Sequence, residues 1–339
     1  MDKVNSEIEI SRSLSAAQRE LDGAFVVTDD NVGRLYAPLL EHAAKTVVIK
    51  HGEDSKTLAT VETLLREAAK FGLDRKSAIV ALGGGVVGDI VGFAAAIYMR
   101  GIEWINIPTT LLAQLDSSIG GKTGVDLDDY KNMVGAFWLP KRVVVCTDFL
   151  KTLPQREVLC GLGEGYKSAL LDREASAAWE KISRDADFEN RDFFELVSSC
   201  ARFKERVTTA DFKEGSLRKI LNLGHTVGHA LEYLDRHRLS HGEYVSVGLS
   251  AEAWLGLTRG VLKQKTYEEI TFGARKLAED FDRLKNGFDG AAVAAAAKSD
   301  KKNRSGKISV IVSENFEQSE LMFTENELKE EIDRWRSAL

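Results

Sequence analysis

The chain has 339 residues, a length that predicts two domains, each large enough to bury its own hydrophobic core. Hydrophobic residues make up 44% of it and charged residues 29%, which excludes a disordered or fibrous chain. The formal net charge is −6 and no basic tract offsets the acidic residues, so the composition argues against a protein that binds nucleic acid.

Two further features predict a cytoplasmic protein with reduced cysteines. Residues 1–7 carry charges where a signal peptide needs an apolar run, and the most apolar stretch, 90–99, is too short to span a bilayer. Cys146, Cys160 and Cys200 include no CxxC pair, so we expect neither a disulfide framework nor a thiolate zinc site.

The first half of the chain alternates short β-branched runs with helical stretches. The predicted strands are 24–28, 46–50, 78–82, 104–107 and 143–146. Strands that alternate with helices form a parallel sheet covered on both faces. We therefore predict an α/β domain with a Rossmann-like parallel sheet over residues 1–150.

The second half has a different composition. All four prolines lie before residue 155, and the remainder is rich in alanine, leucine, glutamate and lysine at helical spacing. The exception is a predicted strand at 307–312, which precedes an amphipathic last helix at about 325–336. We predict a mostly α-helical domain over 151–339.

A glycine-rich loop follows the third predicted strand. Gly83, Gly85 and Gly88 satisfy GxGxxG between a strand and an apolar helix, which is the context of a dinucleotide site. Glycines there let backbone N–H groups approach a pyrophosphate at a helix N-terminus. A tight strand-to-helix turn without a ligand is the alternative, because GxGxxG alone is common.

Histidines cluster in the second half, where four of the six lie between His225 and His241. His225 and His229 are four residues apart, so on a helix they project from one face and can reach one ion. Glu164, in a glycine-rich segment upstream, is a candidate acidic ligand. The cluster predicts a catalytic metal site, whereas His237, in a charged stretch, is interpreted as a solvated loop residue.

Basic residues recur in polar segments, beside glycines or at the start of predicted helices, although the chain as a whole is acidic. They are Arg100, Lys122, Lys167, Lys204, Arg218 and one of Lys301 or Lys302. Together they could hold both a carboxylate and a phosphate, because lysine and arginine supply charge and nearby glycines expose backbone donors.

Several ordered motifs carry a family resemblance. They are Gly83 to Asp89, Pro108 to Lys122, Lys131-Asn132, Glu164 with Lys167, and Leu221 to Ala230. Through them the chain resembles the 3-dehydroquinate synthases of the sugar phosphate cyclase superfamily, from about Asp29 to Lys302. The motifs are specific, and five of them in order are very unlikely by chance.

The resemblance implies an NAD- and metal-dependent carbon–oxygen lyase with zinc or cobalt. Such an enzyme converts 3-deoxy-D-arabino-heptulosonate 7-phosphate to 3-dehydroquinate and phosphate, in the shikimate route to aromatic amino acids. The steps are transient oxidation by NAD, elimination of phosphate, re-reduction and intramolecular aldol closure. The family also suggests a homodimer.

The resemblance further assigns residues to roles. It implies that Glu164, His225 and His241 are the metal ligands and that His229 stays an acid/base group, whereas spacing alone pairs His225 with His229. The other implied catalytic residues are Glu214, Lys122 and Asn132. The implied substrate-binding residues are Arg100, Asp116, Lys122, Asn132, Lys167, Lys204, Arg218, Asn222, Lys301 and Lys302. The implied NAD-binding residues are Asp29, Asn31, Glu53, Lys56, Gly83, Gly84, Gly85, Asp89, Thr109, Thr110, Lys131, Phe149 and Thr152.

Some positions depart from the family pattern, and functions other than dehydroquinate synthesis are possible for the same motifs. Gly163 stands where alanine is usual, and Cys160 replaces a more polar residue; the Gly215-Ser216 order also differs. The alternatives are a 2-deoxy-scyllo-inosose or valiolone synthase, a metal-dependent alcohol dehydrogenase of the same fold, and a non-catalytic NAD-binding protein. Lys204, Arg218 and Asn222 favour a substrate that bears a carboxylate.

Overall fold

The computed structural model describes residues 5–128, 130–184, 191–299 and 306–338. The chain forms two compact units, the first made of Met1–Leu153 and Phe193–Lys213, the second of Pro154–Asp192 and Glu214–Leu339. Lys301 and Lys302, two of the expected substrate-binding residues, lie outside the described residues.

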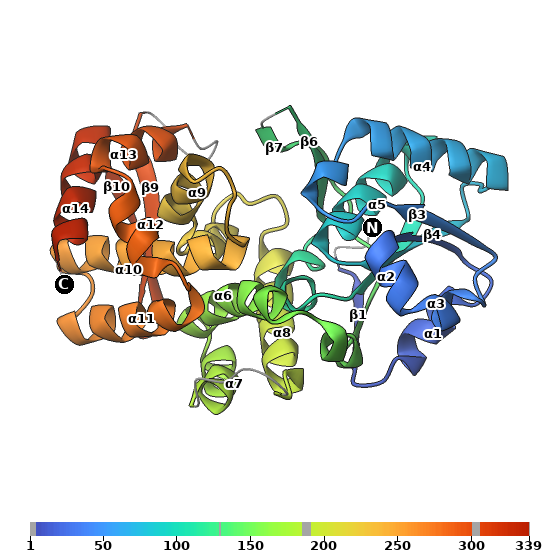
Figure 1. Cartoon of the computed structure of the whole chain (residues 1–339), viewed down its shortest axis with the longest axis horizontal. Helices are drawn as coiled ribbons and strands as arrows, with labels where there is room; N and C mark the ends of the chain where they lie inside the picture. The colour runs from blue at the N-terminus through green and yellow to red at the C-terminus, as the bar shows by residue number, and fades with distance from the viewer. Residues whose placement is uncertain (1–4, 129, 185–190, 300–305, 339) are drawn as a thin grey trace. The chain divides into compact units, whose positions relative to one another are not determined.

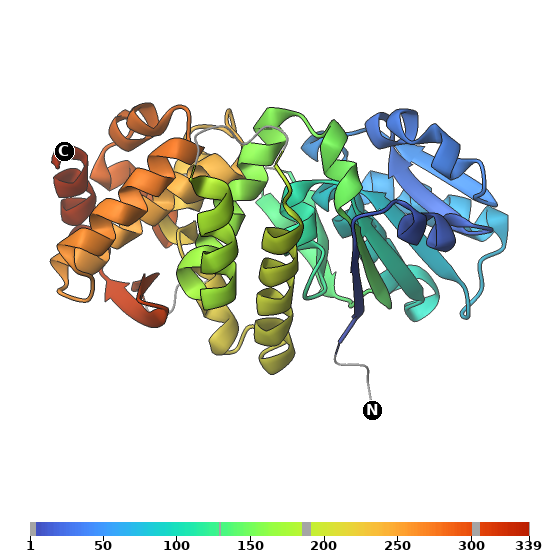
Figure 2. The ribbon, with the colours of Figure 1, turned by 90° about the horizontal axis from the view of Figure 1, so that it is seen from below.

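A six-stranded parallel sheet forms the centre of the first unit (Figure 1). In spatial order its strands are β1 (Glu7–Ser11), β8 (Arg142–Cys146), β5 (Glu103–Pro108), β4 (Ala78–Gly83), β2 (Phe25–Asp29) and β3 (Lys45–Ile49). Figure 2 shows these strands side by side. The five strands predicted from the sequence are confirmed, and β1, an edge strand with alternating glutamates, was not predicted.

Helices cover both faces of this sheet, as predicted. They are α1 (Ser15–Leu21), α2 (Asp30–Leu35), α3 (Ala37–Leu40), α4 (Leu58–Phe71) and α5 (Gly85–Ile97). Because successive side chains of a strand point to opposite faces, Val26 packs in the core with α1 and α2, whereas Val27 packs in the core with α4 and α5. This two-sided burial explains the continuous apolar runs of the strands.

Two more elements complete the first unit. An antiparallel hairpin, β6 (Lys122–Leu127) and β7 (Tyr130–Phe137), packs against α5. Its strands approach closely at Gly135, where a Cβ atom would lie 2.2 Å from the carbonyl oxygen of Thr123. Helix α8 (Phe194–Ala210), from the later part of the chain, packs against the turn at 113–117.

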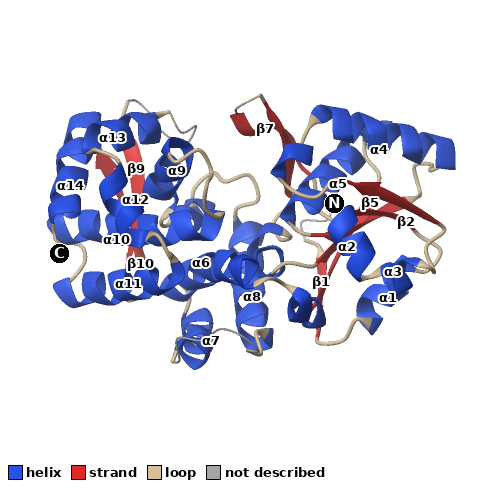
Figure 3. Ribbon diagram, viewed as in Figure 1, coloured by secondary structure: helices blue, strands red, loops and turns tan. Residues whose placement is uncertain are grey.

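The second unit is mainly helical, as predicted (Figure 3). Its helices are α6 (Gln155–Leu171), α7 (Arg173–Ser183), α9 (His225–Leu234), α10 (His241–Thr258), α11 (Gln264–Leu277), α12 (Phe281–Gly287), α13 (Gly290–Lys298) and α14 (Glu325–Ser337). Strands β9 (Ile308–Glu314) and β10 (Glu317–Phe323) form a small antiparallel sheet. Helix α10 is buried on nearly all sides because it packs against α6, α9 and α11.

Two sequence predictions in this unit are met closely. The strand expected at 307–312 is β9, and the helix expected at 325–336 is α14, which begins with a capping box between Thr324 and Glu327. Within the described ranges, no helix has the length and apolar character needed to cross a membrane.

Candidate active site

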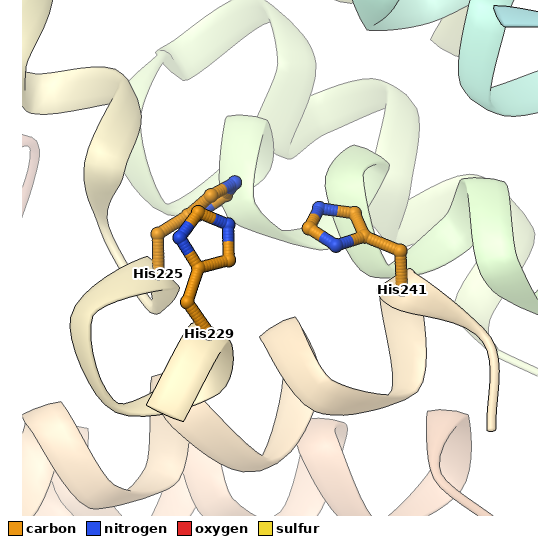
Figure 4. Close-up of side chains that lie close together, drawn as sticks. All are labelled: His225, His229 and His241. Atoms are coloured by element: carbon orange, nitrogen blue, oxygen red, sulfur yellow. The ribbon is translucent and has the colours of Figure 1, made fainter. Parts of the chain in front are cut away.

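Three histidines of the second unit gather in one place (Figure 4). Helix α9 begins at His225, after Gly224 in the left-handed conformation (φ 77°), and carries His229 one turn later. His241 is the first residue of α10. One ring nitrogen from each histidine lies within 4.8 Å of the others, which is close enough for a shared ion.

Glu164 on α6 brings a carboxylate to the same point. It is 2% exposed, and its Oε1 lies 3.2 Å from Nε2 of His225 and 3.2 Å from Nε2 of His241. Its other oxygen pairs with Lys167, one helical turn later and equally buried. Two imidazole nitrogens therefore face one carboxylate oxygen, and the His229 ring lies 5.1 Å from the His225 ring.

The remaining ring nitrogens are also bonded, which fixes how the two imidazoles point. Nδ1 of His225 lies 3.0 Å from the carbonyl oxygen of Leu223, and Nδ1 of His241 lies 3.0 Å from Oε2 of Glu232. Because each Nδ1 donates to its acceptor, the neutral form of each ring keeps the lone pair of Nε2 available for a metal.

The charges at this point are unequal when no metal is bound. Burial, helped by Lys167, lowers the pKa of His225 to about 3. Burial also acts to lower the pKa of His241, but the hydrogen bonds that its ring donates to Glu164 and Glu232 raise it to about 10. Burial acts to raise the pKa of Glu164, yet Lys167 and His225 hold it well below the ordinary range. Once His241 has given up its proton, one carboxylate and two neutral imidazoles form a donor set that zinc and cobalt both accept.

The backbone of α9 is tied to α10 close to these side chains. Glu252 on α10 has no exposed surface, and its carboxylate accepts hydrogen bonds from the backbone N–H of Gly224 at 2.6 Å and of Val227 at 3.0 Å. A carboxylate is favoured at a helix N-terminus, where the dipole is positive. Glu252 therefore holds the start of the helix that carries His225 and His229.

The predicted glycine loop lies in the first unit between β4 and α5. Gly84 precedes the first turn of α5 and has no capping side chain. A Cβ atom would lie 3.0 Å from Thr110 if built at Gly84, and 3.0 Å from Ser117 Oγ if built at Gly85. These glycines, with Asp89 and Ser117, line a small pocket, so the loop leaves space that larger residues would fill.

Buried hydroxyl groups around this pocket suit a polar ligand. Ser117 and Ser118, which line the pocket, each have a buried side-chain oxygen with no hydrogen-bond partner among the described residues, and so does Thr109 after β5. A buried polar atom without a partner is costly, so such atoms are expected where a ligand supplies the bond. The glycine loop and these hydroxyls fit a dinucleotide phosphate.

Several expected NAD-binding residues meet around one buried lysine. Lys56 is 5% exposed, and its Nζ lies 2.7 Å from Asp89, 2.5 Å from Oδ1 of Asn132 and 3.7 Å from Glu53. Burial acts to lower the pKa of Lys56, but Asp89 and Glu53 raise it above the ordinary value. Burial raises the pKa of Asp89 although Lys56 opposes the shift.

Other expected NAD-binding residues follow the carboxyl ends of the parallel strands. Asp29 ends β2 and caps α2, accepting from the backbone N–H of Asn31 at 2.9 Å. Thr109 follows β5, and Phe149 and Thr152 follow β8, where the hydroxyl of Tyr36 lies 2.7 Å from Oγ1 of Thr152. Lys131 is exposed on β7 beside Asn132. Ligands of open α/β sheets bind at these strand ends.

The expected substrate residues divide between the units. In the first, Lys204 donates to the main-chain oxygen of Asp116 at 2.9 Å and pairs with its carboxylate. In the second, Nδ2 of Asn222 donates to Glu214 at 3.2 Å, and Arg218 is 2% exposed. Lys122 is exposed at the start of β6 in the first unit.

Three of the expected residues have strained backbones. Arg100 (φ 71°), Asn132 (φ 51°) and Glu214 (φ 59°) take the left-handed conformation that glycine favours. Such strain persists where the surrounding structure holds it, and it often occurs at functional sites.

Sequence reasoning missed Glu232, Glu252, Ser117 and Ser118 as parts of the site. Glu232 could have been found, because it follows His229 by three residues and therefore shares the helix face of the histidines. Glu252 gave no local signal, since it lies far along the chain from the residues it binds.

Comparisons with known proteins agree with these observations. A family model for the 3-dehydroquinate synthase N-terminal region matches residues 46–160, and one for the C-terminal region matches residues 161–303. The 3-dehydroquinate synthase of Alkaliphilus metalliredigens is 39% identical over 303 residues, 86% of this chain and 83% of the relative. That of Pyrococcus furiosus is 41% identical over 276 residues, 81% of this chain and 79% of the relative.

Solved structures share the fold at lower identity. A 2-deoxy-scyllo-inosose synthase complexed with carbaglucose-6-phosphate, NAD+ and Co2+ has a TM-score of 0.82 at 24% identity, covering 97% of this chain and 96% of its own. A 2-epi-5-epi-valiolone synthase from Streptomyces hygroscopicus, with NAD+ and Zn2+ bound, has a TM-score of 0.85 at 24% identity, covering 99% of this chain and 98% of its own. On the family models and the sequence relatives, the chain belongs to the 3-dehydroquinate synthase family.

Proposed function

We propose that this chain is a 3-dehydroquinate synthase, which converts 3-deoxy-D-arabino-heptulosonate 7-phosphate to 3-dehydroquinate and phosphate. Relatives of that name match the chain over most of both lengths. Within the site, the strongest support for the proposal is the position of Glu164. Its Oε1 lies 3.2 Å from Nε2 of both His225 and His241. This donor set suits a catalytic divalent metal.

The proposed ligands of the metal are Glu164, His225 and His241. Three protein ligands leave zinc or cobalt an open position, as catalytic sites require. When bound, NAD supplies a reversible oxidation of a substrate hydroxyl, and the divalent ion supplies the Lewis acidity that favours it. Solved relatives of the same fold hold NAD+ with Co2+ or Zn2+, which supports both cofactors but not a choice between the metals.

The first proposed acid/base group, His229, lies close to those ligands in the chain and in space. The His229 ring is 5.6 Å from the His241 ring, so its nitrogen can exchange a proton with a substrate held at the metal. Glu214 is a second candidate, since its carboxylate is oriented by Asn222. In the first unit, we propose the same role for Lys122 and Asn132.

The remaining expected residues are proposed to bind two anionic ligands. NAD would contact the glycine loop together with Asp29, Asn31, Glu53, Lys56, Asp89, Thr109, Thr110, Lys131, Phe149 and Thr152. The substrate carries a carboxylate and a phosphate, for which Arg100, Asp116, Lys122, Asn132, Lys167, Lys204, Arg218 and Asn222 supply cations and polar groups. A homodimer and a cytoplasmic location remain our predictions for this chain.

One assay tests the proposed function directly. Chelator-treated protein is resupplied with zinc or cobalt, given NAD below the substrate concentration, and offered the heptulosonate phosphate. We expect one phosphate released per carbocycle and no lasting change at the nicotinamide band, because NAD is regenerated. Consumption of one NAD per product would exclude this scheme and favour an alcohol dehydrogenase. A different carbocycle would favour another sugar phosphate cyclase.

A further inference from the structure

Glu232 connects two histidines at the end of α9. It is 8% exposed, and its Oε2 lies 3.0 Å from Nδ1 of His241. Its Oε1 lies 3.2 Å from Nδ1 of His237, the histidine that the sequence indicated to be a solvated loop residue. One buried carboxylate therefore holds a proposed metal ligand with one oxygen and a loop histidine with the other.

The position of Glu232 is unfavourable for helix stability alone. It lies in the last turn of α9, which ends at Leu234, and a negative charge there is opposed by the helix dipole. The loop after it is also strained, because Arg236 (φ 53°) and His237 (φ 57°) take the left-handed conformation. An unfavourable charge beside a strained loop indicates a function other than stabilising the helix.

The two proposed histidine ligands are oriented by different groups. Nδ1 of His225 is held by the main-chain oxygen of Leu223, which no substitution removes. Nδ1 of His241 is held by a side chain, that of Glu232. A hydrogen bond at Nδ1 selects the imidazole tautomer whose Nε2 can bind a metal, so only the orientation of His241 depends on one replaceable carboxylate.

We propose that Glu232 is a positioning residue that fixes the His241 ring for metal binding, and that His237 fixes Glu232 in turn. The inference rests on the proposed function, because it takes His241 to be a metal ligand. Carboxylates that hold a ligating histidine through its second nitrogen usually affect metal affinity about 10–100-fold. We expect an effect of that size here.

The test compares Glu232→Ala, Glu232→Gln and wild-type protein with Zn2+ and Co2+ as probes. Affinity is measured by competition with a chromogenic chelator, and the ligand field by the Co2+ absorption spectrum. We expect Glu232→Ala to weaken binding about 10–100-fold and to change the spectrum. Glu232→Gln keeps one acceptor oxygen, so we expect its metal affinity to lie between those of the wild-type protein and Glu232→Ala.

Asp235→Asn is the matched control, because it removes a buried carboxylate from the same segment without touching an imidazole. Asp235 is 4% exposed and binds Arg283 and the hydroxyl of Tyr244. We expect this variant to lose thermal stability while its metal affinity and Co2+ spectrum stay at the wild-type values. An effect confined to stability would thus be recognised.

The possible failures are distinguishable. If the wild-type protein binds neither metal, the proposed function is at fault. If the wild-type protein binds metal and Glu232→Ala binds it with equal affinity and the same spectrum, the positioning role is wrong. His237→Ala tests the more distant, exposed member of this chain of contacts. We expect it to weaken metal binding by a smaller factor than Glu232→Ala.

Discussion

Gly163 of α6 and Gly242 of α10 are in direct backbone contact. A Cβ atom built on Gly163 would lie 2.3 Å from the carbonyl oxygen of Gly242, and one built on Gly242 would lie 2.0 Å from that of Cys160. Each glycine neighbours a proposed metal ligand, Glu164 in one helix and His241 in the other. The close helix crossing therefore sets the distance between these two ligands, which gives a structural reason for glycine at position 163.

Replacing Gly163 with alanine should push the two helices apart. The added methyl group meets backbone rather than a flexible side chain, and overpacking of this kind costs about 1–3 kcal/mol. We expect Gly163→Ala to lower the free energy of unfolding in denaturant and to weaken Zn2+ binding. Gly287→Ala is the control, since a Cβ atom there meets nothing within 4 Å. Equal stability of both variants would mean that α6 and α10 adjust without strain.

The three clustered histidines should differ in their effect on metal content. Glu164 faces Nε2 of His225 and of His241, so His225→Ala and His241→Ala should lose zinc. His229→Ala should keep zinc but lose most turnover, because we assign His229 an acid/base role. Such a role typically contributes about 10²–10⁴-fold to the reaction rate. Metal analysis of the purified variants separates these outcomes. Equal metal loss in His225→Ala and His229→Ala would instead support the pairing that their sequence spacing suggests.

Local patterns predicted the fold more completely than the site. The β-branched runs at β2, β4 and β8 identified the sheet because strands buried on both faces must be apolar throughout. The hairpin at β6 and β7 was missed, since its glycines and Lys131 have no clear alternation. Spacing placed His225 and His229 on one helix face, but no local pattern indicates that α6 brings Glu164 to the same point.

Metal binding should release a proton near neutral pH. Without metal, hydrogen bonds to Glu164 and Glu232 hold the pKa of His241 at about 10 despite its burial, so this ring carries a proton at pH 7.5. Burial keeps the pKa of His225 at about 3, so that ring is already neutral. Binding of Zn2+ to His241 must displace its proton.

Calorimetry in buffers of different ionisation enthalpy measures this proton directly. We expect about one proton released per Zn2+ at pH 7.5, and weaker binding as the pH falls. The raised pKa of His241 also means that its contribution to the stability of the metal-free protein is complete below pH 6.5 and is lost as the pH rises toward 10. Zinc binding without proton release would contradict the assigned charge of His241.

Removal of the buried lysine of the first unit should destabilise the protein in a pH-dependent way. Lys56→Met leaves Asp89 partly buried beside Glu53 without its cation. We expect a loss of about 2 kcal/mol at pH 7.5, less than for a fully buried pair because Asp89 keeps some solvent contact. Burial already raises the pKa of Asp89, and loss of Lys56 should raise it further. The carboxyl group then protonates in the folded state first, so the loss should shrink as the pH falls toward 5.

Urea unfolding at pH 7.5 and at pH 5 measures this loss. Lys56→Met/Asp89→Asn is the control, and it should recover stability at pH 7.5. A loss of equal size at both pH values would show that Lys56 acts by packing rather than by charge.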